Sequence, residues 1–144
     1  MTGLTPYLQV NDCNTAIDWY VRVFNARETR TRLIAPDGSC MNAEIEIEGT
    51  RVMLADEMPS IGSVSPQSLG GSSVVLSLHV KDVDRVFSEA LKADAVEVIP
   101  VADQFHGDRA GRLRDPFGHH WIVATQMNVL SDAEIVAGFQ QLFD

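Results

Sequence analysis

The sequence predicts an α+β fold made of two βαβββ modules, and two observations support this prediction. The first is an internal repeat: YLQVND and SLHVKD both read as a short strand that ends at an aspartate, and pairing Asp12 with Asp82 also pairs Leu8 with Leu78. The second is that each copy continues with apolar residues at helical spacing and then with strand-like runs. We expect the strands to form curved mixed sheets around a cavity.

In the first copy, alternating residues before Asp12 predict a half-buried strand followed by a capped helix. The apolar stripe of this helix comprises Ala16, Ile17, Tyr20, Val21 and Phe24. Trp19 lies beside the stripe, so we expect it to be partly exposed or at an interface. The runs ARETRTRLIAP, MNAEIEIEG and TRVMLADE then predict three strands.

In the second copy, Asp82 is expected to cap a helix whose apolar stripe comprises Val83, Val86, Phe87, Ala90 and Leu91. The runs VEVIPVADQ, HGDRAGRLRD and HHWIVAT predict three strands, with DPFG as the last turn. We expect residues 1–144 to form one domain, with module one over about 4–57, a Ser/Gly/Pro-rich linker over 58–73 and module two over 74–125. Ser131 and Glu134 form a capping-box pattern that opens a C-terminal helix over about 131–143.

Charge and composition exclude several classes of partner. The chain has 20 acidic and 11 basic residues and a net charge of −9, which argues against nucleic acid or an anionic membrane as a partner. No apolar run approaches the roughly 18 residues that span a bilayer, and no signal-peptide pattern is visible. Cys13 and Cys40 lie in no CxxC or His-spaced cluster. We expect a cytoplasmic protein with two reduced cysteines.

Six segments carry a family resemblance: YLQVND, AIDWY, VMLADE, LGGSSVVLSLHVKDVD, PVADQFHGDR and RDPFGHHW. Together with the repeated unit, they make the chain resemble the vicinal-oxygen-chelate superfamily, which includes glyoxalase I, extradiol dioxygenases and bleomycin-resistance proteins, and within it the PhnB-like branch. The resemblance covers roughly residues 4 to 127. It implies a glyoxalase/bleomycin-resistance-like fold, a cavity for a small molecule and, in the enzymes, one divalent metal ion.

The resemblance also implies where metal ligands would lie. The positions that supply His, Gln or Glu ligands in the family's enzymes correspond here to Thr5, Ala55, Val75 and Ile122. This set cannot supply the three or four ligands that a catalytic metal needs. We therefore expect no metal at the inherited site and no other cofactor.

A relocated metal site is the alternative. His79, Glu44 and His120 are expected to face the cavity, and such a set could bind zinc or manganese. His119 cannot join His120 on one ion, because consecutive residues of a strand point to opposite faces. We expect His119 to complete the DPFG turn and His120 to line or rim the cavity.

Strand alternation and the loop around HGDR indicate which residues line the cavity. The expected set is Tyr7, Gln9, Glu44, Ser77, His79, Gln104, Phe105, Arg109 and His120. An aromatic residue beside polar groups is typical of a ligand pocket, but Phe105 and Arg109 could equally serve as a loop scaffold. Arg114 and Asp115 are expected to form ion pairs that hold this loop to the last turn.

Three functions remain open. The leading hypothesis is a homodimer that binds a small, partly aromatic molecule without a metal. The repeated fold pattern is complete, whereas the positions of the family's metal ligands hold residues that cannot bind a catalytic metal. The alternative is a metal-dependent lyase, isomerase or dioxygenase of the same fold with a relocated metal. A third is a metal-free acid–base enzyme that uses His79 or Glu44. Sheet edges and the apolar surface at Trp19 support the expected dimer.

Overall fold

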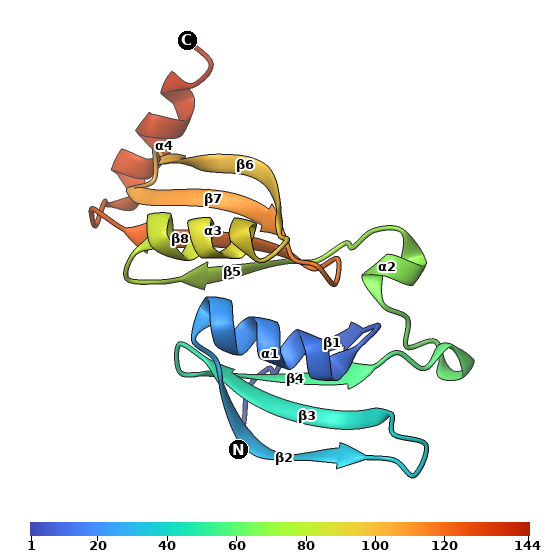
Figure 1. Ribbon diagram of the computed structural model, residues 1–144. Helices are drawn as coiled ribbons and strands as arrows, with labels where there is room; N and C mark the ends of the chain where they lie inside the picture. Colours follow the sequence, from blue (N-terminus) through green and yellow to red (C-terminus); the bar gives the residue numbers. More distant parts are fainter. The chain divides into compact units, whose positions relative to one another are not determined.

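The computed structural model describes residues 1–144 and confirms the α+β fold (Figure 1). The first half contains β1 (Tyr7–Val10), α1 (Cys13–Phe24), β2 (Arg27–Ile34), β3 (Cys40–Ile47) and β4 (Thr50–Asp56). The second half contains β5 (Val75–His79), α3 (Val83–Lys92), β6 (Val96–Asp103), β7 (Asp108–Arg114) and β8 (His120–Gln126). The expected C-terminal helix is present as α4 (Asp132–Gln141).

The chain forms two compact units that share one topology. The first comprises residues 1–74 and 116–119, and the second comprises residues 75–115 and 120–144. Each unit contains one four-stranded sheet, in the order β1-β4-β3-β2 or β5-β8-β7-β6. The pairs β1–β4 and β5–β8 are parallel, and the other neighbours are antiparallel. The internal repeat in the sequence is thus a repeat of the fold.

In the first unit, α1 packs on β1, β3 and β4. The Asp12 carboxylate caps this helix by accepting a hydrogen bond from the Thr15 backbone N–H at 3.2 Å. Asp56, at the end of β4, ties the helix start to the sheet, because its two oxygens accept from the backbone N–H groups of Cys13 at 2.7 Å and Cys40 at 2.8 Å. Both cysteines are fully buried and free, and burial raises the pKa of the Cys13 thiol.

The sequence predicts Trp19 to be partly exposed or at an interface, and the predicted partial exposure is wrong. Trp19 is only 8% exposed, and its ring makes edge-to-face contacts with Tyr20, Phe24 and Phe117 at centroid distances of 5.4, 5.3 and 6.4 Å. Phe117 belongs to the turn over 116–119, which packs within the first unit. Trp19 therefore no longer supports a dimer, although Val96, Val98 and Ile99 on the edge strand β6 remain exposed. The homodimer stays a prediction.

In the second unit, α3 packs on β6, β7 and β8. Asp82 caps it by accepting from the Arg85 backbone N–H at 3.2 Å, and Thr125 Oγ1 accepts from the Val83 backbone N–H at 2.9 Å. Asp115 is 2% exposed and accepts a hydrogen bond from the Trp121 indole N–H at 2.8 Å, which helps to anchor the core.

The expected linker contains two short helical segments, η1 (Pro59–Ile61) and α2 (Pro66–Leu69). Ser65 caps α2, and Glu57 accepts hydrogen bonds from the Ser65 backbone N–H at 2.9 Å and the Ser68 hydroxyl at 2.8 Å. These hydrogen bonds hold the pKa of Glu57 below its usual value. None of the helices is both long enough and apolar enough to cross a membrane.

The Asp56 carboxylate offers a test of how the first unit is held together. Asp56→Asn leaves only one side-chain oxygen to accept, so one of two backbone N–H groups loses its partner. We expect the free energy of unfolding to fall by about 1–3 kcal/mol in chemical denaturation. The exposed Asp94→Asn is the matched control and should change it by less than about 0.5 kcal/mol. Equal effects of the two substitutions would contradict the assigned role.

Candidate functional site

The face of the second unit's sheet that α3 leaves uncovered carries most of the candidate residues. Alternation along β5 places Val75, Ser77 and His79 on this exposed face, whereas Leu78 is buried. On β8 the same rule exposes His120 and Ile122, which pair in register with Val75 and Ser77. Helix packing uses one face of the sheet, so the other remains available to a ligand.

A pocket of about 170 Å³ lies on this exposed face. It is lined by Ile99, Gln104, His106, Ala110, Gly111, Arg112 and Ile122. The residues come from β6, β7, β8 and the β6–β7 turn, and Ile99, Arg112 and Ile122 are cross-strand neighbours. Apolar walls with a few polar groups are the usual composition of a small-molecule site.

Arg112 is the most unusual residue of the pocket. Its Nη2 donates to Nδ1 of His120 at 3.3 Å, while its Nε is buried and has no hydrogen-bond partner. An unsatisfied buried donor costs about 1–3 kcal/mol, more when the group is charged, and native structures contain few of them. A hydrogen-bond acceptor beside this Nε–H would remove the cost.

A histidine–carboxylate pair lies beside the pocket. His79 Nε2 is 2.8 Å from Oδ2 of Asp108, and Nδ1 of the pocket-lining His106 is 3.9 Å from the same oxygen. The His79 side chain is 58% exposed, whereas that of Asp108 is only 15% exposed. Asp108 and Arg112 are four residues apart on β7, or about 13 Å along the strand. The pocket therefore has a cationic group toward one end and an imidazole–carboxylate pair toward the other.

The first unit carries the other expected cavity residues on the exposed face of its own sheet. The Tyr7 hydroxyl donates to the Met41 carbonyl at 3.2 Å and accepts from the Asn42 amide at 2.9 Å. Glu44 accepts from the Thr29 hydroxyl at 2.8 Å and pairs with Arg51 at 3.4 Å. These polar groups satisfy one another.

A hydrogen bond connects His119 with Gln9 within the first unit. The His119 Nε2 donates to the Gln9 backbone carbonyl at 3.0 Å. His119 belongs to the first unit with the rest of the turn, while His120 begins β8 of the second unit. The two adjacent histidines thus serve different parts of the fold, as expected for the turn residue.

Six expected cavity residues lie in the second unit, and the structure separates them into two groups. Gln104 lines the pocket, and Ser77, His79 and His120 lie on the same sheet face. Phe105 and Arg109 do not line it. The Phe105 ring packs against Phe139 of α4 at a centroid distance of 5.7 Å.

Arg109 of β7 has a structural role, because its side chain links β7 to α3. Its Nε and Nη2 donate to Asp84 at 2.9 and 3.0 Å, and its Nη1 donates to Asp103 at 3.1 Å. Hydrogen bonds from Arg109 lower the pKa of Asp84, and hydrogen bonds to Asp84 and then Asp103 raise the pKa of Arg109. The sequence shows these charges but not which of them pair.

Sequence reasoning missed one functional candidate, Arg112, and it grouped His106 and Asp108 only with the loop expected beside the pocket. Their residue types were visible in HGDRAGRLR. What was not visible is that Arg112 is turned into a hollow, which depends on the irregular pairing of β6 with β7 around Ile99. Strand alternation places Ala110 and Arg112 on the same face of β7, so the sequence could have assigned Arg112 to the exposed face of the sheet. It could not have shown that the Nε of Arg112 lacks a hydrogen-bond partner.

The inherited metal positions do not fit a metal ion. Ala55 is buried, Val75 and Ile122 are aliphatic, and Thr5 donates no side-chain ligand beyond a hydroxyl that already accepts from Arg51 at 3.0 Å. No group of three or more His, Cys, Asp or Glu side chains in the structure could hold a metal ion.

The relocated set also has other partners. His79 contacts Asp108, Glu44 contacts Thr29 and Arg51, and His120 contacts Arg112. The structure supplies no positive geometric support for this set, and a relocated metal stays an alternative prediction.

Comparison with known proteins identifies the family. The family model of the glyoxalase/bleomycin resistance protein/dioxygenase superfamily matches residues 4–123. An uncharacterized protein of Mycobacterium bovis is 42% identical over 145 residues, which cover 99% of this chain and 95% of the relative.

Two solved structures show the shared architecture. The crystal structure of TioX from Micromonospora sp. ML1 is 27% identical with a TM-score of 0.66 and covers 90% of this chain and 100% of TioX. A protein from Bacillus cereus described as a putative 3-demethylubiquinone-9 3-methyltransferase, PhnB protein, is 17% identical with a TM-score of 0.66 and covers 86% of this chain and 99% of its own. At that identity the second likeness concerns the fold alone.

The unpaired Nε–H of Arg112 predicts an unusual effect on the stability of the fold. Arg112→Met keeps the length of the side chain and removes the unpaired N–H together with the contact between Nη2 and His120 at 3.3 Å. These two effects oppose each other, so without ligand we expect the free energy of unfolding to change by less than about 1 kcal/mol. Arg109→Met is the matched control and should lower stability, because it breaks the contacts with Asp84 and Asp103. A loss of several kcal/mol in Arg112→Met, measured by urea denaturation, would show that Arg112 serves the fold instead.

Proposed function

Because the chain belongs to the glyoxalase/bleomycin resistance protein/dioxygenase superfamily, we propose that it binds a small molecule in the pocket of the second unit, without the catalytic metal of the superfamily's enzymes. The buried Nε of Arg112, which has no partner within the chain, is the observation that carries this proposal. The position of this charged donor in the pocket wall supports a ligand that brings a matching acceptor.

The pocket lining favours a compact ligand with an anionic end. A guanidinium group pairs best with a carboxylate or another planar or tetrahedral oxyanion. Ile99, Ala110 and Ile122 offer apolar contacts, and Gln104 and His106 add polar groups at the β6–β7 turn. At about 170 Å³ the pocket is smaller than the ~300–1,000 Å³ of sites for drug-sized ligands, which favours a small compound or one end of a larger one.

Three compounds of the same shape test the charge requirement. Benzoate should bind, whereas neutral benzamide and cationic benzamidine should bind this pocket at least about tenfold more weakly, because only benzoate can pair with Arg112. The measurement is a titration followed by amide chemical shifts in ¹⁵N-labelled protein. Arg112→Met should abolish benzoate binding, and Arg109→Met, which removes the same charge outside the pocket, should preserve it. Equal binding of benzoate to both variants would contradict the proposal.

The absence of a catalytic metal is a separate prediction. Purified protein should contain far less than one zinc, manganese, iron or nickel per chain by elemental analysis, and chelator should not lower its melting temperature. A ligand at 100 times its dissociation constant stabilises a protein by about 2.7 kcal/mol, so a real metal site would be evident in the melting curve. Near-stoichiometric metal that is lost in His79→Ala or Glu44→Ala would instead support the metal-dependent lyase, isomerase or dioxygenase.

The contact between His79 and Asp108 favours a second candidate, a metal-free acid–base enzyme. A carboxylate that holds one imidazole nitrogen fixes the orientation of the ring and leaves the other nitrogen free to move a proton. The 2.8 Å distance between His79 Nε2 and Asp108 Oδ2 meets the requirement for this arrangement. Asp108 is therefore the partner that we propose for His79.

Pyruvate tests this candidate, because its methyl protons lie beside a carbonyl and exchange with solvent when a base removes them. Deuterium from solvent should enter its methyl group faster with the protein than in buffer, as followed by proton NMR. The rate should fall at least about tenfold in His79→Gln and Asp108→Asn and remain unchanged in His119→Gln, whose ring contacts Gln9. Equal rates in all three variants would exclude the acid–base role for this substrate.

A further inference from the structure

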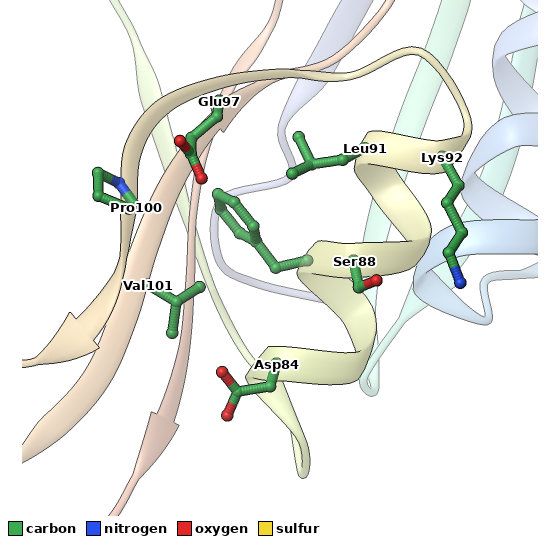
Figure 2. A pocket seen from close by; sticks show the side chains of 8 residues that line it. Asp84, Ser88, Leu91, Lys92, Glu97, Pro100 and Val101 are labelled. Carbon is green, nitrogen blue, oxygen red and sulfur yellow. The ribbon is translucent and has the colours of Figure 1, made fainter.

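A second hollow lies on the helix-covered side of the same sheet, between α3 and the edge strand β6. Its volume is about 540 Å³, within the range of small-molecule sites. The lining residues are Asp84, Phe87, Ser88, Leu91, Lys92, Glu97, Pro100 and Val101. In Figure 2, Glu97 of β6 lies at one end of the groove and Asp84 of α3 lies near the other.

The backbone of the second unit explains the hollow. The pairing of β6 with β7 shifts register between Glu97 and Ile99 and again between Ile99 and Ala102, so β6 is irregular along the groove. Gly111 of β7 permits close packing below it, because a Cβ there would lie 2.9 Å from both Phe87 and Val101. Phe87 is consequently buried at the base of the groove, and the groove above its ring stays open.

The first unit shows what occupies the equivalent space. The strand ladders match position by position: Arg27 pairs with Glu46 as Val96 pairs with Arg114, and Leu33 pairs with Asn42 as Ala102 pairs with Ala110. Counting along the strands makes Glu28 equivalent to Glu97 and Arg32 equivalent to Val101. Counting from the capping residues Asp12 and Asp82 makes Asn14 equivalent to Asp84 and Asp18 equivalent to Ser88.

In the first unit, Arg32 spans the space between strand and helix. Its guanidinium donates to Glu28 at 2.8 and 3.1 Å and to Asn14 at 2.6 Å, and lies 3.9 Å from Asp18. Only 25% of the Arg32 side chain is exposed. The hydrogen bonds with Arg32 lower the pKa of Glu28. The chain thus provides its own guanidinium for this groove.

In the second unit, the carboxylate is kept and the cation is missing. Val101 stands where Arg32 would be, and Glu97 has no ion pair or side-chain hydrogen bond within the chain. Lys92 does not replace the cation: its Nζ pairs with Glu89 at 3.5 Å, and Figure 2 shows it directed away from Glu97. Asp84 is already paired with Arg109, which leaves Glu97 as the available carboxylate.

We propose that this groove binds the guanidinium or amidinium group of a small organic cation, with Glu97 in the role that Glu28 plays for Arg32. Leu91, Pro100 and Val101 provide apolar contacts for the body of the molecule, and the ring of Phe87 adds an aromatic wall. This site is on the opposite side of the sheet from Arg112, so it is independent of the proposed anion pocket.

Benzamidine is the probe, with neutral benzamide as its isostere, at about 0.15 M salt to screen the general attraction of an acidic protein for cations. Amide shifts in α3 and β6 should follow benzamidine and not benzamide. Glu97→Gln should weaken benzamidine binding at least about tenfold, because it removes the charged acceptor. Asp94→Asn removes the same charge from the neighbouring loop and should change the affinity by less than about twofold.

A second variant tests the groove without a ligand. Val101→Arg recreates the arrangement around Arg32, so it should abolish benzamidine binding and raise the melting temperature, and Glu97→Gln in the same chain should cancel that rise. Arg112→Met should leave benzamidine binding unchanged, which separates this site from the anion pocket. Equal shifts with benzamide, or unchanged benzamidine affinity in Glu97→Gln, would overturn the proposal.

Discussion

The central constraint is that each four-stranded sheet buries only one face. A single helix covers that face, and strand alternation sends every second side chain to the other. On β3 the buried residues Ala43, Ile45 and Ile47 alternate with the partly exposed Asn42, Glu44 and Glu46. The helix-covered face thus provides most of the packing, and the opposite face is free to carry polar chemistry without weakening the core.

The two units use this common frame differently. In the first, Glu44 is satisfied by Thr29 and Arg51, and Arg32 fills the space beside α1. The equivalent ladder position to Glu44 in the second unit is Arg112, whose Nε is unsatisfied, and Val101 replaces Arg32. In the first unit the polar side chains pair with one another, whereas in the second unit Arg112 and Glu97 line pockets without such partners. We infer that binding is concentrated in the second unit.

Much of the fold could be predicted because it depends on local patterns. Asp12 and Asp82 begin helices at the expected positions, and the alternation around Leu8 and Leu78 correctly separates buried from exposed residues. The burial of Trp19 could not be predicted, because it depends on a turn at Phe117 nearly a hundred residues away. Local periodicity carries no information about such a contact.

The site was only partly predictable for the same reason. Alternation identified the face of His79 and His120, but the partners Asp108 and Arg112 come from a different strand. Arg109 was a reasonable pocket candidate until its pairing with Asp84 on α3 was known. Charge type can be read from sequence, whereas the pairing of charges requires the arrangement of the strands.

Ligand binding at Arg112 can be observed at the Nε–H itself. Its side-chain ¹⁵N resonance can be assigned by its loss in Arg112→Met and followed while benzoate is added. We expect this resonance to move and its exchange with water to slow as the ligand oxygen accepts the hydrogen bond, while the resonance of the already paired Arg109 stays in place. An unchanged Arg112 resonance at benzoate concentrations that saturate the protein would show that Arg112 does not bind the ligand.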